Sequence, residues 1–308
     1  MIKLSWSQRC TLQLCHRAYK YKYIDNIVPR SFNKALNFGS VFHELVATLY
    51  TKGLGEALKS IDASLAKVDT SSFQQDDFDE LQWQTIVLNS MVLAISESYL
   101  AGDIADGFKV IEAEKSHIAK PITTATGRKI KGFIYECIPD LVIRDKDSFL
   151  WLVEYKTTSK IGQSYFERLQ IDEQTNGMIY FLEKEYGEKF KGIIFRVIKK
   201  PGIRQTKKET SVQFFDRLQD VMTSRYGDYF FEQIFLRDEA LIKEFEVNLE
   251  QTCKALRYII KQELYYKDTS KCSLHKCGYL PLCCNQSGAE MLFEEKKARE
   301  EETSEQHF

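Results

Sequence analysis

Apolar residues follow helical spacing through the first third of the chain. Between residues 35 and 51 the spacing is that of one helix face, with apolar side chains at Leu36, Val41, Phe42, Leu45, Val46 and Leu49. Further helical patterns run from 55 to 105, among them "LQWQTIVLNSMVLAISESYL", after the polar "DTSSFQQDDFD". The pattern predicts a helical insertion over residues 45–105.

The pattern changes to that of strands between residues 109 and 158. The segments "KVIEAEKSHI", "GFIYECIPDLVIRD" and "SFLWLVEYKTT" read as strands, and the polar "RDKDS" predicts a turn between the last two. A helix is expected over residues 162–185, a strand in "KGIIFRVIKK" and mostly helix over 210–266. Elements in this order predict an α/β domain with helical decoration.

The last of these strands carries charges inside an apolar run. In "LWLVEYKTT" the alternation of side chains places Glu154 and Lys156 on one face and Tyr155 on the other. Asp140 comes from the preceding strand, and a hairpin around residues 145–148 brings it back alongside Glu154. Two carboxylates and an ammonium group are therefore expected to converge.

Two adjacent carboxylates repel each other unless a cation lies between them. Oxygen ligands suit Mg²⁺ or Mn²⁺, which polarise a phosphoryl oxygen and acidify a bound water, while a lysine stabilises negative charge. The alternative is a solvated strand face, which often explains Glu-x-Lys. The apolar run "FLWLV" favours a central strand instead, where an unpaired charge is costly.

Composition and charge restrict the class of protein. Of the 308 residues, 44% are apolar, which is ample for a substantial core. No apolar run is long enough to span a membrane and the first residues lack a secretory pattern, so we expect a soluble, cytoplasmic protein without a membrane partner. A formal charge of -1 argues against coating nucleic acid by bulk attraction. Local phosphate and base contacts are still offered by "CHRAYKYKYI" and "FRVIKKPGIRQTKKE".

Eight cysteines are present, and four of them fall between residues 272 and 284. In a reducing compartment such clustering indicates a metal site rather than disulfides. The segment is too rich in Cys, Gly and Pro for regular structure. Zinc held by local ligands, including His275, and an iron–sulfur cluster both fit the spacing.

Several motifs together resemble one nuclease family. Pro139 and Asp140 followed by "EYK" at 154–156 are similar to the signature of the PD-(D/E)XK nuclease superfamily. "FGSVFHE", with Gly39 and His43, resembles the Gly-x-x-x-His helix of its RecB-like branch. This branch includes the CRISPR-associated iron–sulfur exonucleases and the AddB-type nucleases.

Two further motifs appear in the order found in that branch. Glu114 resembles the glutamate on the strand before the Pro-Asp motif. "DEQTNGMIYFLEK" is similar to the Gln-x-x-x-Tyr helix at Gln174, but Met178 stands at the tyrosine position and Tyr180 falls on another face.

The resemblance implies a restriction-endonuclease-like α/β core with a central mixed sheet, a helical insertion and termini clipped together by an iron–sulfur cluster. One nuclease domain is then expected over residues 1–290, with a cluster-binding segment at 267–285 and a charged, disordered tail at 291–308. The implied ligands of a 4Fe-4S cluster are Cys15, Cys272, Cys277 and Cys283. Cys284 and Cys10 compete with them.

The same resemblance implies a metal-dependent DNA exonuclease that acts on DNA ends or single strands. The implied ligands of Mg²⁺ or Mn²⁺ are His43, Asp140, Glu154 and the Tyr155 carbonyl. Lys156 would serve the attacking water, Glu114 would be auxiliary, and Gln174 would contact DNA near the cleaved phosphate. The alternatives are a non-catalytic adaptor subunit of a recombination or CRISPR integration complex and a zinc-stabilised interaction domain.

Overall fold

The computed structural model describes residues 1–30, 34–66, 70, 73–119, 122–124, 126–274 and 277–295. The chain divides into two compact units. The first comprises Met1–Leu4 and Phe32–Cys253, and the second comprises Ser5–Ser31 and Lys254–Phe308.

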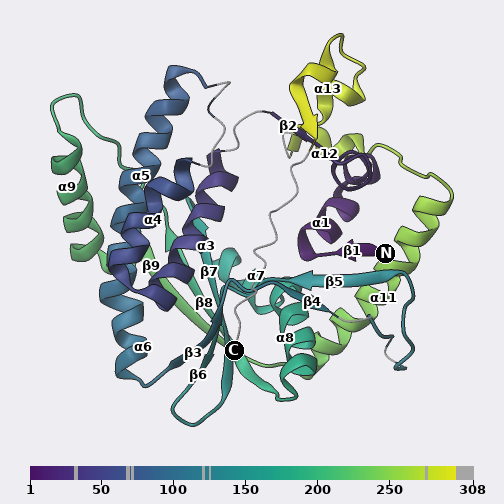
Figure 1. Cartoon of the computed structure of the whole chain (residues 1–308), viewed down its shortest axis with the longest axis horizontal. Helices are drawn as coiled ribbons and strands as arrows, with labels where there is room; N and C mark the ends of the chain where they lie inside the picture. The colour runs from purple at the N-terminus through teal and green to yellow at the C-terminus, as the bar shows by residue number, and fades with distance from the viewer. Residues whose placement is uncertain are drawn as a thin grey trace, which may run out of the picture. The chain divides into compact units, whose positions relative to one another are not determined.

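A five-stranded mixed sheet forms the centre of the first unit (Figure 1). Its strands follow the order β3 (Lys109–Ala113), β6 (Leu141–Arg144), β7 (Leu150–Thr158), β8 (Phe190–Lys199) and β9 (Phe230–Leu236). β7 and β8 are parallel, and the other neighbours are antiparallel. The prediction of an α/β protein with a central mixed sheet is confirmed.

A second, three-stranded sheet belongs to the same unit. It contains β5 (Phe133–Cys137), with β1 (Ile2–Leu4) parallel to it and β4 (His117–Ala119) antiparallel to it. The apolar segment "GFIYECIPDLVIRD" is therefore divided between two sheets. Pro139 lies at the break and lacks the N–H that a continuing strand would donate. The break leaves Asp140 directly before β6.

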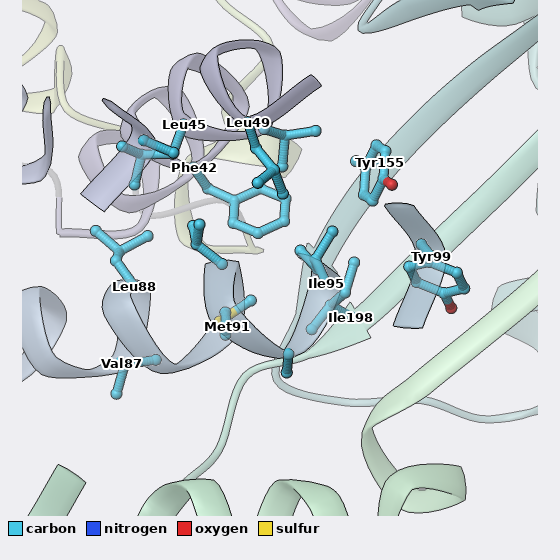
Figure 2. Packing of buried hydrophobic residues seen from close by; sticks show 14 of the residues in the cluster. Phe42, Leu45, Leu49, Val87, Leu88, Met91, Ile95, Tyr99, Tyr155 and Ile198 are labelled. Atoms are coloured by element: carbon cyan, nitrogen blue, oxygen red, sulfur yellow. The ribbon is translucent and has the colours of Figure 1, made fainter. Parts of the chain in front are cut away.

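Helices cover the face of the sheet that carries Val153 and Tyr155. They are α3 (Lys34–Lys52), α4 (Leu54–Ala66), α5 (Gln75–Ile95), the π-helix η2 (Ser96–Leu100), α6 (Ala101–Ala105) and α9 (Ser211–Ser224). Figure 2 shows how α3 and α5 pack against each other and against the sheet, through Phe42, Leu45, Leu49, Leu88, Met91, Ile95, Tyr155 and Ile198. This core fixes α3 beside β7.

The helical run from Gln75 to Ala105 is long and apolar enough to cross a membrane by length and composition alone. In the structure its residues Val87, Leu88 and Met91 are fully buried in the core described above. The run comprises α5, η2 and α6, and its buried face forms part of the core of the first unit.

Two predicted helical regions differ from the structure. The helix expected over 162–185 is divided into α7 (Gln163–Gln170) and α8 (Glu173–Tyr186), because the Asp172 carboxylate accepts the Gln174 N–H at 2.7 Å and caps α8. Within 210–266, β9 separates α10 (Tyr226–Tyr229) from α11 (Glu239–Lys261). Short apolar segments such as "FFEQIFL" do not distinguish strand from helix by periodicity.

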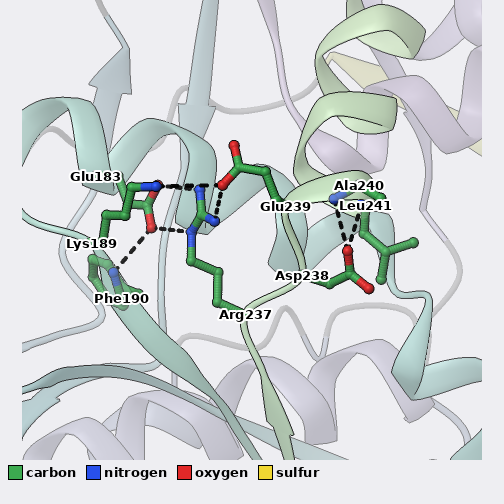
Figure 3. Close-up of polar contacts among 8 residues, drawn as sticks. All are labelled: Glu183, Lys189, Phe190, Arg237, Asp238, Glu239, Ala240 and Leu241. Carbon is green, nitrogen blue, oxygen red and sulfur yellow. Dashed lines mark hydrogen bonds and ion pairs between the residues drawn. The ribbon is translucent and has the colours of Figure 1, made fainter.

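An ion pair joins the C-terminal end of α8 to the end of β9 (Figure 3). Arg237 Nη2 donates to Glu183 Oε2 at 2.9 Å, and Glu183 Oε1 accepts the Phe190 N–H at 3.0 Å. Arg237 also contacts Glu239 at the start of α11. This cluster ties two helices to two strands.

The second unit is built from the two ends of the chain. The N-terminal part contains α1 (Trp6–Leu14), α2 (His16–Tyr19), the π-helix η1 (Lys20–Ile24) and β2 (Ile27–Pro29). The C-terminal part contains α12 (Thr269–Leu274), α13 (Leu280–Cys283), η3 (Ala289–Leu292) and β10 (Phe293–Glu295), which pairs antiparallel with β2. Short helices thus occupy the cysteine-rich segment, where none was predicted. β10 lies within the expected tail, and residues 296–308 lie outside the described residues.

Candidate active site

Asp140 is fixed against β7 by the hairpin between β6 and β7. Leu141 pairs with Val153, so Asp140 lies next to Glu154. The Asp140 N–H donates to Glu154 Oε1 at 3.5 Å, and Asp140 Oδ2 accepts the Tyr155 N–H at 2.6 Å. Both carboxylates are buried, with Asp140 6% and Glu154 1% exposed. The backbone of β7 therefore fixes one oxygen of Asp140.

The other oxygen of Asp140 faces His43 on α3. His43 Nδ1 lies 2.8 Å from Asp140 Oδ1. This buried nitrogen has no well-aligned hydrogen-bond partner among the described residues. The two groups form an ion pair when the imidazole is protonated, and a bound metal would replace that proton, because a metal-binding histidine is neutral. Burial lowers the pKa of His43, but Asp140, Glu154 and Glu114 raise it overall to about 9.

Glu114 completes a group of possible metal ligands. One ligand atom from each of His43, Glu114 and Asp140 lies within 4.8 Å of the other two. Glu114 adopts a left-handed backbone conformation with φ of 47°, which is strained for a non-glycine residue and is found at functional sites. Its N–H donates to the carbonyls of Pro139 and Asp140 at 3.1 and 3.0 Å. The sequence predicts only an auxiliary role for Glu114, whereas the structure places it with the ligand candidates.

Glu154 and Lys156 form a second pair on β7. Lys156 Nζ lies 2.9 Å from Glu154 Oε2 and donates to Gln174 Oε1 at 3.1 Å. Burial and Asp140 raise the pKa of Glu154 to about 7, against the opposing effect of Lys156. Burial lowers the pKa of Lys156, but Glu154 and Asp140 raise it overall. The lysine is therefore an ammonium ion at neutral pH.

Helix α8 provides one of the two polar groups that the resemblance implies. Gln174 lies in the first turn of α8 and contacts Lys156. Met178, at the expected tyrosine position, is 4% exposed. The Tyr180 hydroxyl donates to Glu246 Oε1 of α11 at 2.7 Å. Its proton is therefore already used in a hydrogen bond within the protein.

Tyr165 on α7 is a site candidate that the sequence pattern did not reveal. Burial raises its pKa, while the charges of Lys156 and Arg168 oppose the rise. The Arg168 guanidinium lies 5.7 Å from the centre of the Tyr165 ring. The sequence pattern predicts a single helix over residues 162–185 and does not separate α7 from α8. It therefore gives no sign that Tyr165 lies on a separate short helix.

The geometry described above coincides with a family match over most of the chain. A family model described as the PD-(D/E)XK nuclease superfamily matches residues 3–284. The chain belongs to this superfamily. No curated protein matches it. Among solved structures, "Crystal Structure of LHK-Exo in complex with dAMP" is similar, with 15% identity over 67% of this chain and 91% of that chain and a TM-score of 0.27. A TM-score this low does not establish a shared fold.

Two cations of the predicted basic stretch are paired with carboxylates of this nuclease, the buried Arg196 and the exposed Arg204. Arg196 is 3% exposed, and its Nη1 donates to Asp103 Oδ2 at 2.6 Å. Arg204 pairs with Glu80 at 2.9 Å and lies 3.9 Å from the centre of the Trp83 ring. Arg196 is therefore a structural cation and not the phosphate contact that the sequence predicts.

The cysteines proposed as cluster ligands all belong to the second unit of the nuclease. Cys15 Sγ accepts the Asp268 N–H at 3.5 Å, and Cys272 Sγ donates to the Asp268 carbonyl at 3.7 Å. Burial raises the pKa of Cys277, and so do the nearby Cys272 and Cys15.

Among the described residues, the proposed cysteine ligands do not form a group whose sulfur atoms all lie within 4.8 Å of one another. Burial raises the pKa of Cys283, and Cys277 and Cys15 contribute. None of the eight cysteines, all of which lie within the described residues, forms a disulfide, and Cys284 is exposed. His275, which the zinc alternative requires, lies outside the described residues.

Proposed function

We propose that this nuclease hydrolyses phosphodiester bonds in DNA with Mg²⁺ or Mn²⁺. The observation that carries the proposal is the group of His43, Glu114 and Asp140, whose ligand atoms lie within 4.8 Å of one another. The two carboxylates supply the oxygen ligands that these cations prefer. Glu154 and the Tyr155 carbonyl are further proposed ligands. When bound, the cation polarises the phosphoryl oxygen and acidifies the attacking water.

The chain's own groups would position the reacting atoms. Lys156 is held by Glu154 and Gln174 at 2.9 and 3.1 Å, so its charge needs little rearrangement to stabilise a developing negative charge. Asp140 is similarly fixed by the Tyr155 N–H. A buried, preorganised site of this kind stabilises charge more strongly than water does.

We propose DNA ends or single strands as the substrate and exonuclease cleavage as the mode. The motifs that resemble the RecB-like branch support this choice. Tyr165 on α7 offers a ring on which an unpaired base can stack, a role that Met178 cannot fill. We also propose a soluble, intracellular protein with partners in recombination or CRISPR adaptation.

We further propose that Cys15, Cys272, Cys277 and Cys283 hold a 4Fe-4S cluster. Four thiolates from the two ends of the chain suit such a cluster, which would stabilise the second unit. Zinc is the rival, because it accepts the same thiolates. Iron, labile sulfide and zinc measured on anaerobically purified protein decide between them, and a colourless zinc protein would reject the cluster.

The activity is tested by digesting end-labelled linear DNA and circular single-stranded DNA, each with and without Mn²⁺. We expect the wild-type protein to degrade linear DNA only with metal and to spare the circle. Asp140→Asn, purified in parallel, should abolish cleavage. Equal rates for the two proteins would reject the site, and cleavage of the circle would reject the exonuclease mode. DNA binding without cleavage would favour the adaptor alternative.

A further inference from the structure

A buried histidine in the first unit lies between two carboxylates outside the proposed ligand group. His117 is 4% exposed. Its Nε2 lies 2.5 Å from Glu112 Oε1, and its Nδ1 lies 2.9 Å from Glu185 Oε2. Burial lowers the pKa of His117, but Glu112 and Glu185 raise it overall. Protonation of both ring nitrogens lets each donate to a carboxylate.

The contact between His117 and Glu112 closes a short loop. The two residues are five positions apart, and Glu114 lies between them. Glu114 has the left-handed backbone conformation, with φ of 47°, and its N–H donates to two carbonyls beside Asp140. The loop therefore presents a proposed metal ligand in a strained conformation that its surroundings must maintain.

The two ends of this loop are anchored in different sheets. Glu112 pairs with Val142 of β6, next to a register irregularity between Val110 and Glu112. His117 pairs with Cys137 of β5 in the smaller sheet. Between these two ladders the loop is held by the Glu114 N–H and by the Ser116 hydroxyl, which donates to Glu136 Oε1 at 3.1 Å, but neither contact joins its two ends. The His117–Glu112 contact links them directly.

The third member of the cluster connects the loop to α8. Glu185 lies near the C-terminal end of this helix, whereas Gln174, which contacts Lys156, lies near its start. One helix therefore touches the loop of Glu114 through Glu185 and the catalytic lysine through Gln174.

We propose that His117 is a positioning residue that holds Glu114 in place for the metal. This inference rests on the proposed function, in which Glu114 is a metal ligand. Removing the imidazole takes away the cation between Glu112 and Glu185. Lys115 Nζ stays 3.4 Å from Glu112 Oε2, but it is exposed and lies within the loop, so it does not join the two ends. The two carboxylates then repel each other and the ends of the loop separate. Glu114 can then relax out of its strained conformation and away from His43 and Asp140.

The inference is tested by measuring Mn²⁺ binding directly, by electron paramagnetic resonance or calorimetry, without DNA. We expect His117→Gln to weaken Mn²⁺ binding by about tenfold or more, the size seen when groups supporting metal ligands are lost. Glu185→Gln should weaken it less, because the loop-closing contact with Glu112 remains.

Glu183→Gln is the matched control. Glu183 lies on the same helix two residues away and supports the Arg237 ion pair of Figure 3 instead of His117. We expect this variant to lower the melting temperature of the metal-free protein and to leave Mn²⁺ binding unchanged. Unchanged Mn²⁺ binding in His117→Gln, or an equal loss in Glu183→Gln, would overturn the inference.

The readout also separates this inference from the proposed function. Glu114→Gln should weaken Mn²⁺ binding at least as much as His117→Gln. If neither wild type nor variants cleave DNA but the order of Mn²⁺ affinities holds, the positioning role stands and the nuclease function fails. If Glu114→Gln binds Mn²⁺ as wild type does, the positioning role is overturned whether or not DNA is cleaved.

Discussion

Asp140 has a different partner for each of its carboxylate oxygens. Oδ2 accepts a backbone N–H from β7, while Oδ1 faces His43 across 2.8 Å. Lys156 instead pairs with Glu154 and Gln174. At the scale of single residues, the site therefore separates the ligand group that includes His43 and Asp140 from the pair that Lys156 forms with Glu154, a further proposed ligand.

Replacing Lys156 with methionine tests this separation. Lys156→Met keeps an unbranched side chain but removes the charge, so we expect cleavage at saturating Mn²⁺ to slow by about 10²–10³-fold, as when one electrostatic stabiliser is lost. Mn²⁺ binding should be retained, because Glu154 loses a competing cation. Single-turnover rates and binding titrations measure the two effects. Lys160→Met, which removes an exposed lysine beyond β7, should cleave normally, and normal cleavage by Lys156→Met would contradict the role.

The His117 cluster makes the stability of the fold depend on pH. Burial lowers the pKa of His117, but Glu112 and Glu185 raise it overall. A histidine whose pKa is higher in the folded than in the unfolded protein stabilises the fold when it is protonated. This contribution is complete at a pH below the unfolded pKa of about 6.5, and it is lost as the pH rises through the pKa of the folded protein. Urea unfolding of the wild type and His117→Gln should therefore differ most in mildly acidic solution. A difference that grows at alkaline pH would contradict this assignment.

At the scale of elements, Arg196 joins parts of the chain that lie far apart in sequence. Its Nη1 donates to the Tyr50 hydroxyl at 2.8 Å and to Asp103 Oδ2 at 2.6 Å, and its Nε donates to Glu232 Oε2 at 2.9 Å. The Tyr155 hydroxyl lies 2.9 Å from that of Tyr50. The network connects α3, α6, β7, β8 and β9. It therefore fixes the helix of His43 against the strand of Glu154.

Breaking this network should destabilise the first unit strongly. Arg196→Met leaves Asp103, which is 5% exposed, without its bidentate partner, and removing one member of a buried pair costs about 3–5 kcal/mol. Arg225→Met, which breaks the exposed ion pair with Asp228, should cost less than about 1 kcal/mol. Urea denaturation of both variants measures the difference. Equal losses would show that the Arg196 network contributes no more than a surface pair.

The sequence predicts the strand and the turn that form the site better than the conformation and burial of single residues. The alternation of side chains in β7 and the turn after β6 follow from local rules, and they suffice to bring Asp140 beside Glu154. The left-handed conformation of Glu114 and the burial of Arg196 depend on contacts between distant segments, which periodicity does not encode. β9 was missed because a short aromatic strand also fits a helix. The role of His43 as a metal ligand was predicted only from the resemblance to a family, because a single histidine in an apolar helix does not by itself indicate a metal ligand.

At the scale of the whole molecule, the two units divide the proposed chemistry between them. His43, Glu114, Asp140, Glu154 and Lys156 all belong to the first unit, and Cys15, Cys272, Cys277 and Cys283 all belong to the second. Loss of the cluster should therefore affect the second unit first.

Cysteine variants test this division. We expect Cys283→Ser to lose most of the iron, because three remaining thiolates leave the cluster with an incomplete ligand set. Cys284→Ser, the adjacent exposed residue, should keep the iron of the wild type. Iron and sulfide content per chain, with the visible absorbance, measure both. Equal iron loss in the two variants would show that Cys284 is a ligand as well.

The division between units also has a consequence for biosynthesis. The first four residues add β1 to the first unit, the next segment belongs to the second unit, and the chain returns to the second unit only after Cys253. During synthesis, the segment with Cys15 is therefore made before residues 32–253 of the first unit. The other part of the second unit, with Cys272, Cys277 and Cys283, is made only after them. A nascent chain that ends at Cys253 already contains all the proposed metal ligands of the first unit, but only Cys15 of the four proposed cluster ligands.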